Sequence, residues 1–286
     1  MCAMLYERRF RNYGIGCLIL TLLAITGCIE LDEVTQFAKA SQDVGKAFPG
    51  IADEAEASCR RANSFVNAQN QLPPLLCDVY PTLKAPLVNV NAALFNYIAS
   101  LGKLASTDLS KVPGGLSNLS ADLKQADPAI SSENQTKAAA IAGLATAITN
   151  LWASGYRQDQ VSKIIGENDD AIQKVTEFLS GYAADKYHQS LKDEWRYESS
   201  YCINMATAAE PLATDLLNKK CSGDKSRIDV QLKAIEAYQG ALATIRETHK
   251  KLNADRQHWD ARQLAKDLGP EIVSLGNAAV SVNKAF

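Results

Sequence analysis

The first long stretch of the chain carries apolar or small residues at alternating steps of three and four. These residues are Leu31, Val34, Ala38, Ser41, Gly45, Phe48, Ala52, Ala55, Cys59, Ala62 and Val66. This spacing places them all on one side of an α-helix, and over several heptads it is typical of helices packed in bundles. Pro49 and Gly50 interrupt the run without changing its phase. We therefore expect one kinked helix or two stacked helices over this stretch.

Similar stripes predict the rest of the architecture. The second helix follows Pro86, which would lie in its first turn, and its stripe is Leu87, Val90, Leu94, Tyr97, Leu101 and Leu104. Further helices are expected over about 132–155, over about 160–209 with Gly166 and Gly181 as weak points, around 228–252, and over about 261–285 with a kink at Gly269 and Pro270. Residues 107–131 predict a loop with one short helix. Because strand patterns are essentially missing, the predicted fold class is all-α: an elongated multi-helix bundle with heptad-like seams.

A faint internal repeat suggests that the bundle could consist of two similar three-helix units. Cys59 and Cys77 recur as Cys202 and Cys221 at nearly the same offset. The possible halves are residues 29–157 and 158–286. A single elongated bundle whose long helices need similar covalent clips explains the same pattern, so both interpretations stay open.

Before the first stripe, the chain has a cationic segment and a short apolar run. Arg8, Arg9 and Arg11 precede residues 18–28, which end in Ile25-Thr26-Gly27-Cys28. The apolar run is too short to span a bilayer comfortably as a permanent helix. The pattern resembles the lipobox signal peptide of bacterial lipoproteins.

The resemblance implies a cellular location for the mature chain. Residues 1–27 would be a signal peptide that is removed, and Cys28 would become the first residue, with a diacylglyceryl group on its sulfur and an acyl chain such as palmitate on its amine. Ile29 follows in place of an aspartate, which in such lipoproteins favours the outer membrane, with the body facing the periplasm. An ordinary cleaved signal, an uncleaved anchor and an envelope with one membrane are the alternatives.

Four cysteines remain in the body of the chain after Cys28. In an oxidising compartment such thiols favour disulfides. Two pairs have similar separations, and each brackets a proline-containing stretch between helical patterns. We therefore predict the disulfides Cys59–Cys77 and Cys202–Cys221. A metal site built from all four thiolates is disfavoured, because no Cys-x2-Cys spacing occurs.

The charge balance and the motifs argue against nucleic-acid binding and enzymatic activity. The 30 basic and 32 acidic residues nearly balance, so the sequence lacks the excess of positive charge that is typical of nucleic-acid-binding proteins. The three histidines are His188, His249 and His258, and no nucleophile elbow, P-loop or dinucleotide motif occurs. Asp185 and His188, with Glu194 and Glu198 further along, could offer metal ligands, but we interpret them as the charged face of a solvated helix. We expect no enzymatic activity, no cofactor and no metal.

Aromatic residues cluster in the long helix that is predicted over 160–209. They are Tyr187, Trp195, Tyr197 and Tyr201, interleaved with charged residues. They could form a partner or ligand surface. We favour the structural interpretation, in which large side chains fill a wide bundle end near Cys202.

Taken together, these patterns favour a lipid-anchored helical module that binds or spaces another envelope protein without chemistry of its own. A periplasmic small-molecule sensor or carrier, with a pocket between helices near Tyr182 to Tyr201, is the second interpretation. A membrane-active helical protein that opens at Ala138 to Leu151 is the third, but that stretch is too short to span a bilayer as a helix.

Overall fold

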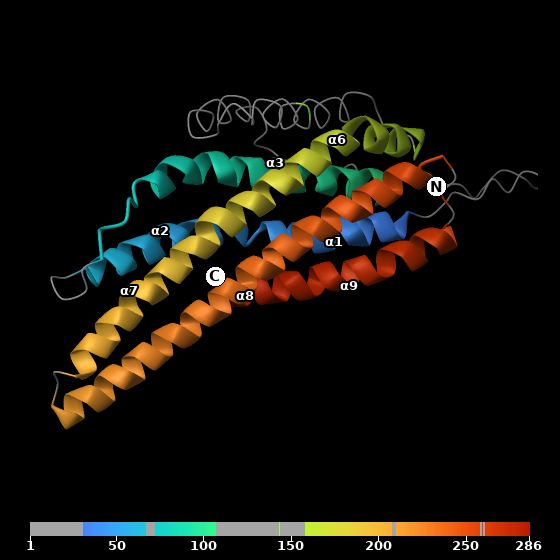
Figure 1. Ribbon diagram of the computed structural model, residues 1–286. Coiled ribbons are helices and arrows are strands. Elements are labelled where there is room, and N and C mark those ends of the chain that lie inside the picture. Colours follow the sequence, from blue (N-terminus) through green and yellow to red (C-terminus); the bar gives the residue numbers. More distant parts are fainter. Residues whose placement is uncertain are drawn as a thin grey trace, which may run out of the picture.

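A computed structural model describes residues 31–66, 72–106, 143, 158–207, 210–257, 259 and 261–286. Its elements are α1 (Asp32–Gly45), α2 (Phe48–Ser64), α3 (Val79–Ser106), α6 (Gln158–Tyr182), η3 (Ala183–Tyr187), α7 (His188–Ala206), α8 (Pro211–Asp255) and α9 (Ala261–Ala285). No strand occurs in these ranges. The all-α bundle that the sequence predicts is therefore confirmed (Figure 1).

In the described ranges the helices form five rods, because α1 runs on into α2, and α6, η3 and α7 are continuous (Figure 1). α1 packs against α3 and α9, α2 against α3 and α7, and α8 against α6, α7 and α9. One hydrophobic core runs through all of them. Residues 107–142 and 144–157 lie outside the described residues, so the internal repeat, the predicted loop over 107–131 and most of the helix over 132–155 stay predictions.

The first stripe of the sequence is buried along its length. Its members from Leu31 to Ala62 are all buried, and Val66 is half-buried. The interruption produces two stacked helices, with Pro49 in the first turn of α2, where its missing N–H costs nothing. α1 and α3 approach closely, because a Cβ atom at Gly45 would overlap the ring of Phe95. The stripe is thus a true packing seam.

α3 begins earlier than the sequence predicts. Its stripe from Leu87 to Leu104 is buried as expected, but the helix starts at Val79 and contains Pro86. Leu83, one turn before Leu87, is also buried. The apolar surface buried by this extra turn offsets the hydrogen bond that Pro86 cannot donate.

The other long helices follow the predicted pattern closely. The π-helical turn η3 comes directly after Gly181, one of the predicted weak points. Pro211 opens α8, and Gly269 and Pro270 lie within α9 without ending it. The predicted stripe of α8 is buried, and comprises Ile228, Gln231, Ile235, Tyr238, Leu242, Ile245 and Leu252.

The two ends of the bundle differ (Figure 1). At one end, which we name the basal end, α1 begins, α3 ends, α6 begins and α8 connects to α9. At the other end α7 and α8 continue as a pair past the remaining rods. Residues 202–207 and 210–221 of this pair form the part that we name the hairpin tip.

Candidate functional site

α7 is fixed to α2 and α8 by a buried ion cluster around Glu194. Its Oε1 accepts hydrogen bonds from Arg61 Nε and Arg227 Nη2, both at 2.5 Å, and its Oε2 accepts one from Arg61 Nη2 at 3.0 Å. Glu54 accepts bonds from the same two arginines. Burial alone would raise the pKa of Glu194, but the bonds from Arg61 and Arg227 outweigh it and the pKa is lowered. Glu194 is therefore a buried carboxylate that holds three helices together.

This cluster corrects one expectation from the sequence. Glu194 and Glu198 were expected on a solvated face with Asp185 and His188, yet both glutamates are buried. Asp185 is exposed and His188 is half-buried. The pattern within one helix could not reveal the difference, because the arginine partners lie on α2 and α8.

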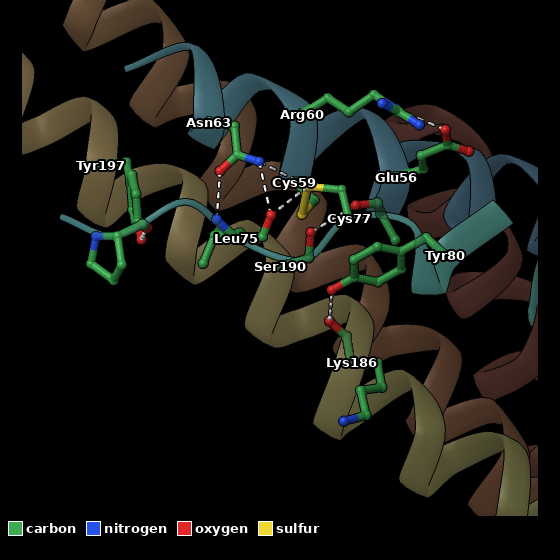
Figure 2. Close-up of a disulfide and its surroundings, with 12 residues drawn as sticks. Glu56, Cys59, Arg60, Asn63, Leu75, Cys77, Tyr80, Lys186, Ser190 and Tyr197 are labelled. Atoms are coloured by element: carbon green, nitrogen blue, oxygen red, sulfur yellow. Dashed lines mark hydrogen bonds and ion pairs between the residues drawn. A yellow bond between two sulfur atoms is a disulfide. The ribbon is translucent and has the colours of Figure 1, made fainter. Parts of the chain in front are cut away.

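The first predicted disulfide is present and fastens the segment after α2 (Figure 2). Cys59 of α2 and Cys77 are both buried, with Cα atoms 5.7 Å apart. Next to it, the Asn63 side chain donates to the Leu75 carbonyl at 2.9 Å and accepts from the Leu75 N–H at 2.7 Å. The disulfide and the two hydrogen bonds hold this segment along α2.

Side chains of α7 also bond to the segment after α2 and to α2 itself. Tyr197 donates its hydroxyl hydrogen to the Pro73 carbonyl (Figure 2). Ser190 donates to the Ala55 carbonyl at 2.7 Å. Together with the ion cluster, these contacts fix the direction in which α7 leaves the body of the bundle.

The second predicted disulfide, Cys202–Cys221, joins α7 to α8 at the base of the hairpin tip. One turn earlier, the buried Glu198 accepts a hydrogen bond from Lys220 Nζ at 3.1 Å, and Lys220 also bonds Asp224 at 2.6 Å. Burial raises the pKa of Glu198 to about 7, with the hydrogen bond to Asp224 acting in the same direction. For Asp224, burial would raise the pKa, but its bonds with Glu198 and Lys220 lower it. At pH values below about 7 the two carboxyl groups share a proton across the α7–α8 contact.

Beyond the disulfide, large apolar side chains face solvent. Ile203 is 67% exposed, Met205 41%, Leu212 76% and Leu216 61%. Leu212 and Leu216 lie one turn apart and therefore share a face of α8. No charged residue occurs between Glu198 and Glu210 in the sequence. Clustered exposed apolar side chains mark interaction surfaces in soluble proteins, which makes the hairpin tip the candidate site.

Exposed large apolar side chains elsewhere are scattered. Among the described residues they are Leu76, Val79, Val230, Val273 and Val280. They are spread over several elements and are fewer on each than in the hairpin tip, and isolated exposed apolar residues are normal on protein surfaces. Val273 and Val280 of α9 therefore provide a natural control for substitutions in the hairpin tip.

The aromatic cluster that the sequence offered as a surface is largely packed. Tyr187 and Tyr197 are buried, at 2% and 0% exposure, and the ring of Tyr187 lies 6.0 Å from that of Phe48. Trp195 and Tyr201 are half-buried. These aromatic side chains fill the wide end of the bundle, in agreement with the interpretation favoured from the sequence. The exposed apolar surface begins one turn further along α7. Cys28 lies outside the described residues.

A second buried polar array crosses the core between α3, α6 and α8. His249 Nδ1 lies 2.8 Å from Asp169 Oδ1, and His249 Nε2 lies 3.0 Å from the Tyr97 hydroxyl. The hydrogen bond with His249 lowers the pKa of Asp169, and burial raises that of Tyr97 well above its ordinary value. The carboxylate therefore accepts from Nδ1–H, and Nε2 shares a second hydrogen bond with the phenol hydroxyl. Because Tyr97 and His249 are both buried, the array braces the core.

Two further tests concern the described part of the chain. Its histidine, cysteine, aspartate and glutamate side chains form no group of three or more that could hold a metal ion. None of its helices combines the length and apolar character needed to cross a bilayer.

Comparison of the chain with models of protein families, with curated proteins and with solved structures finds no match. Its function is therefore argued from its own residues.

Proposed function

We propose that the chain is a lipid-anchored, non-enzymatic module of the bacterial cell envelope that binds another envelope protein through the hairpin tip. Lipid on Cys28 would anchor it, with the outer membrane and its periplasmic face as the proposed location. The cluster of exposed apolar side chains beyond the Cys202–Cys221 disulfide carries the proposal.

The composition of the hairpin tip favours a protein partner. Interface cores are depleted in charge, and the α7 part of the hairpin tip carries none, whereas its α8 part carries Glu210, Asp215, Lys219 and Lys220 around the exposed leucines. Leu212 and Leu216, at i and i+4, are spaced as anchors of a helix that lies in an apolar groove. A membrane surface with anionic lipids is a poorer fit, because the first basic residue after this uncharged run is Lys219.

The attachment of the hairpin tip supports the same conclusion. Its two helices are joined covalently at Cys202 and Cys221, and the buried cluster around Glu194 holds α7 on two other helices. A surface that is held in its binding conformation loses less entropy when it binds. The hairpin tip is thus preorganised for a partner.

A small-molecule carrier has less support. Its expected pocket would use the aromatic residues of α7, but Tyr187 and Tyr197 are packed in the core. The stretch from Ala138 to Leu151, which a membrane-active mechanism would use, lies outside the described residues except for Gly143.

Photocrosslinking in the native envelope tests the proposal. A photoreactive residue at Leu212 should give one discrete adduct with an envelope protein, and Leu216→Glu should reduce its yield at least tenfold. The matched control places the photoreactive residue at Val273 and combines it with Val280→Glu. Equal adducts from positions 212 and 273, or an adduct at 212 that survives Leu216→Glu, would rule out the hairpin tip as the binding surface.

A further inference from the structure

The distance along the chain from Cys28 to the first buried residue determines how the protein meets its membrane. We infer that the basal end rests directly on the lipid headgroups, so that the bundle stands upright and holds the hairpin tip far from the bilayer. This inference rests on the proposed lipidation of Cys28.

The tether between lipid and protein is very short. Cys28 and Leu31 are three residues apart in the sequence, and three residues span at most about 11 Å when fully extended. Leu31 is 2% exposed and immediately precedes α1. A lipid on Cys28 therefore brings the start of α1 within about the same distance of the headgroups.

The start of α1 cannot move away from the rest of the basal end. Thr35 donates its hydroxyl hydrogen to the Gly102 carbonyl at 3.2 Å, and a Cβ atom at Gly102 would overlap the Cβ of Ala38. These contacts lock the first turns of α1 to the last turns of α3. A membrane that reaches Leu31 therefore reaches the end of α3 as well.

The remaining elements of the basal end are tied together in the same way. Ser162 of α6 donates to the Arg256 carbonyl after α8 at 2.8 Å. The indole of Trp259 donates to the Leu252 carbonyl at 3.2 Å. The basal end is thus one surface built from five helix ends, and it meets the bilayer as a unit.

The long sides of the bundle expose a few apolar side chains, such as Val273 and Val280 of α9, together with many charged ones. They carry ion pairs of opposite sign, such as Lys174 with Asp170, and Lys225 with Asp229. Such pairs are well hydrated and nearly neutral, so they neither insert into lipid nor attract an anionic surface strongly. An upright orientation is favoured over one in which the bundle lies flat.

The length of α8 sets the height of the hairpin tip. Its 45 residues from Pro211 to Asp255 span about 68 Å at 1.5 Å per residue. Since α8 ends at the basal end and begins in the hairpin tip (Figure 1), the tip stands about 70 Å from the headgroups. A partner bound there lies at that distance from the anchoring membrane.

Depth-dependent fluorescence quenching tests this orientation. Mature lipidated protein is reconstituted in phosphatidylethanolamine and phosphatidylglycerol vesicles with a fluorescent residue either at Ala254, exposed near the basal end, or at Ala213, exposed in the hairpin tip. Lipids with a spin label at the headgroup should quench the fluorophore at 254 at least fivefold more than the one at 213. Equal quenching at both positions, or none at 254, would overturn the upright orientation.

A tether variant supplies the control. Twenty Gly and Ser residues inserted after Ile29 leave Cys28 and the bundle unchanged, and should reduce quenching at 254 to the level at 213. Intact mass measured on the same samples separates the two proposals. A wild-type mass without lipid refutes the anchored module itself, whereas a lipidated chain with equal quenching at both positions refutes only its upright orientation.

Discussion

The body of the bundle and the hairpin tip use the same two helices in opposite ways. In the body, α7 and α8 bury residues such as Leu191, Tyr197 and Ile228 among neighbouring helices. In the hairpin tip the same helices expose Ile203 and Leu212 to solvent. The change occurs within about one turn, at the level of the Cys202–Cys221 disulfide. Apolar side chains that remain exposed where the core has ended add little to stability, and such side chains are typical of interaction surfaces.

The largest expected effect lies in the body, at the ion cluster. Glu194→Ala removes three hydrogen bonds between a buried carboxylate and Arg61 and Arg227, which keep only Glu54 as a shared partner, and should lower the free energy of unfolding by about 3–5 kcal/mol. Urea unfolding followed by circular dichroism measures the loss. Arg196→Ala, which removes the exposed partner of the half-buried Asp193 on the same helix, is the control and should cost about 0–1 kcal/mol. Similar losses for the two variants would contradict the account of the buried cluster.

The next largest effects should come from the two disulfides, one of which stabilises the body of the bundle and the other the hairpin tip. They close loops of 18 and 19 residues, so chain entropy alone predicts about 3 kcal/mol for each. We expect Cys59→Ser/Cys77→Ser to lower the global unfolding free energy by about that amount. Cys202→Ser/Cys221→Ser should instead speed hydrogen exchange mainly in residues 203–216, because the hairpin tip can open while the body stays folded. Equal global losses with no local change in exchange would show that tip and body unfold as one unit.

A smaller effect is expected from pH at the junction of body and hairpin tip. Folded Glu198 keeps its proton up to about pH 7, whereas its ordinary value is 4.5. Between these values the unfolded chain binds fewer protons, so stability falls as pH rises through this window. Glu198→Gln should flatten the dependence of Tm on pH between 5 and 7. A dependence that Glu198→Gln leaves unchanged would contradict the shared proton, whereas His188, whose pKa is lowered by burial, affects both proteins alike.

The smallest effect on stability should come from the hairpin tip itself. Leu212→Glu/Leu216→Glu removes no buried contact and should change the free energy of unfolding by about 0.5 kcal/mol or less. Val273→Glu/Val280→Glu provides the same comparison on α9. A loss above 2 kcal/mol for the tip variant would mean that these leucines pack within the fold and do not serve as a free surface.

Sequence patterns anticipated the fold better than the site, for physical reasons. The spacing from Leu31 to Ala62 and from Ile228 to Leu252 is a local property of a helix, and it identified the buried faces directly. The two disulfides followed from cysteine count and separation along the chain. The start of α3 was misplaced, because a proline in a helix interior looks like a helix start when only the following stripe is considered.

Long-range partners explain the other differences. The sequence alone indicated no partner for His249, because that partner, Asp169, lies on another helix, α6. Glu194 looked like a solvated residue until Arg61 and Arg227 were placed beside it. Periodicity within one helix also could not show where the helices that cover α7 and α8 end. For this reason the exposure of Leu212 and Leu216 became visible only in three dimensions.

The disulfide at the base of the hairpin tip has one more consequence, for proteolysis. A protease that cuts the connection between Ala206 and Pro211 separates the chain into two fragments, but Cys202 and Cys221 still join them covalently. The two helices of the hairpin tip would remain attached to each other after the cut. A nick between Thr207 and Glu210, both of which are exposed, therefore leaves the molecule in one piece until the disulfide is reduced.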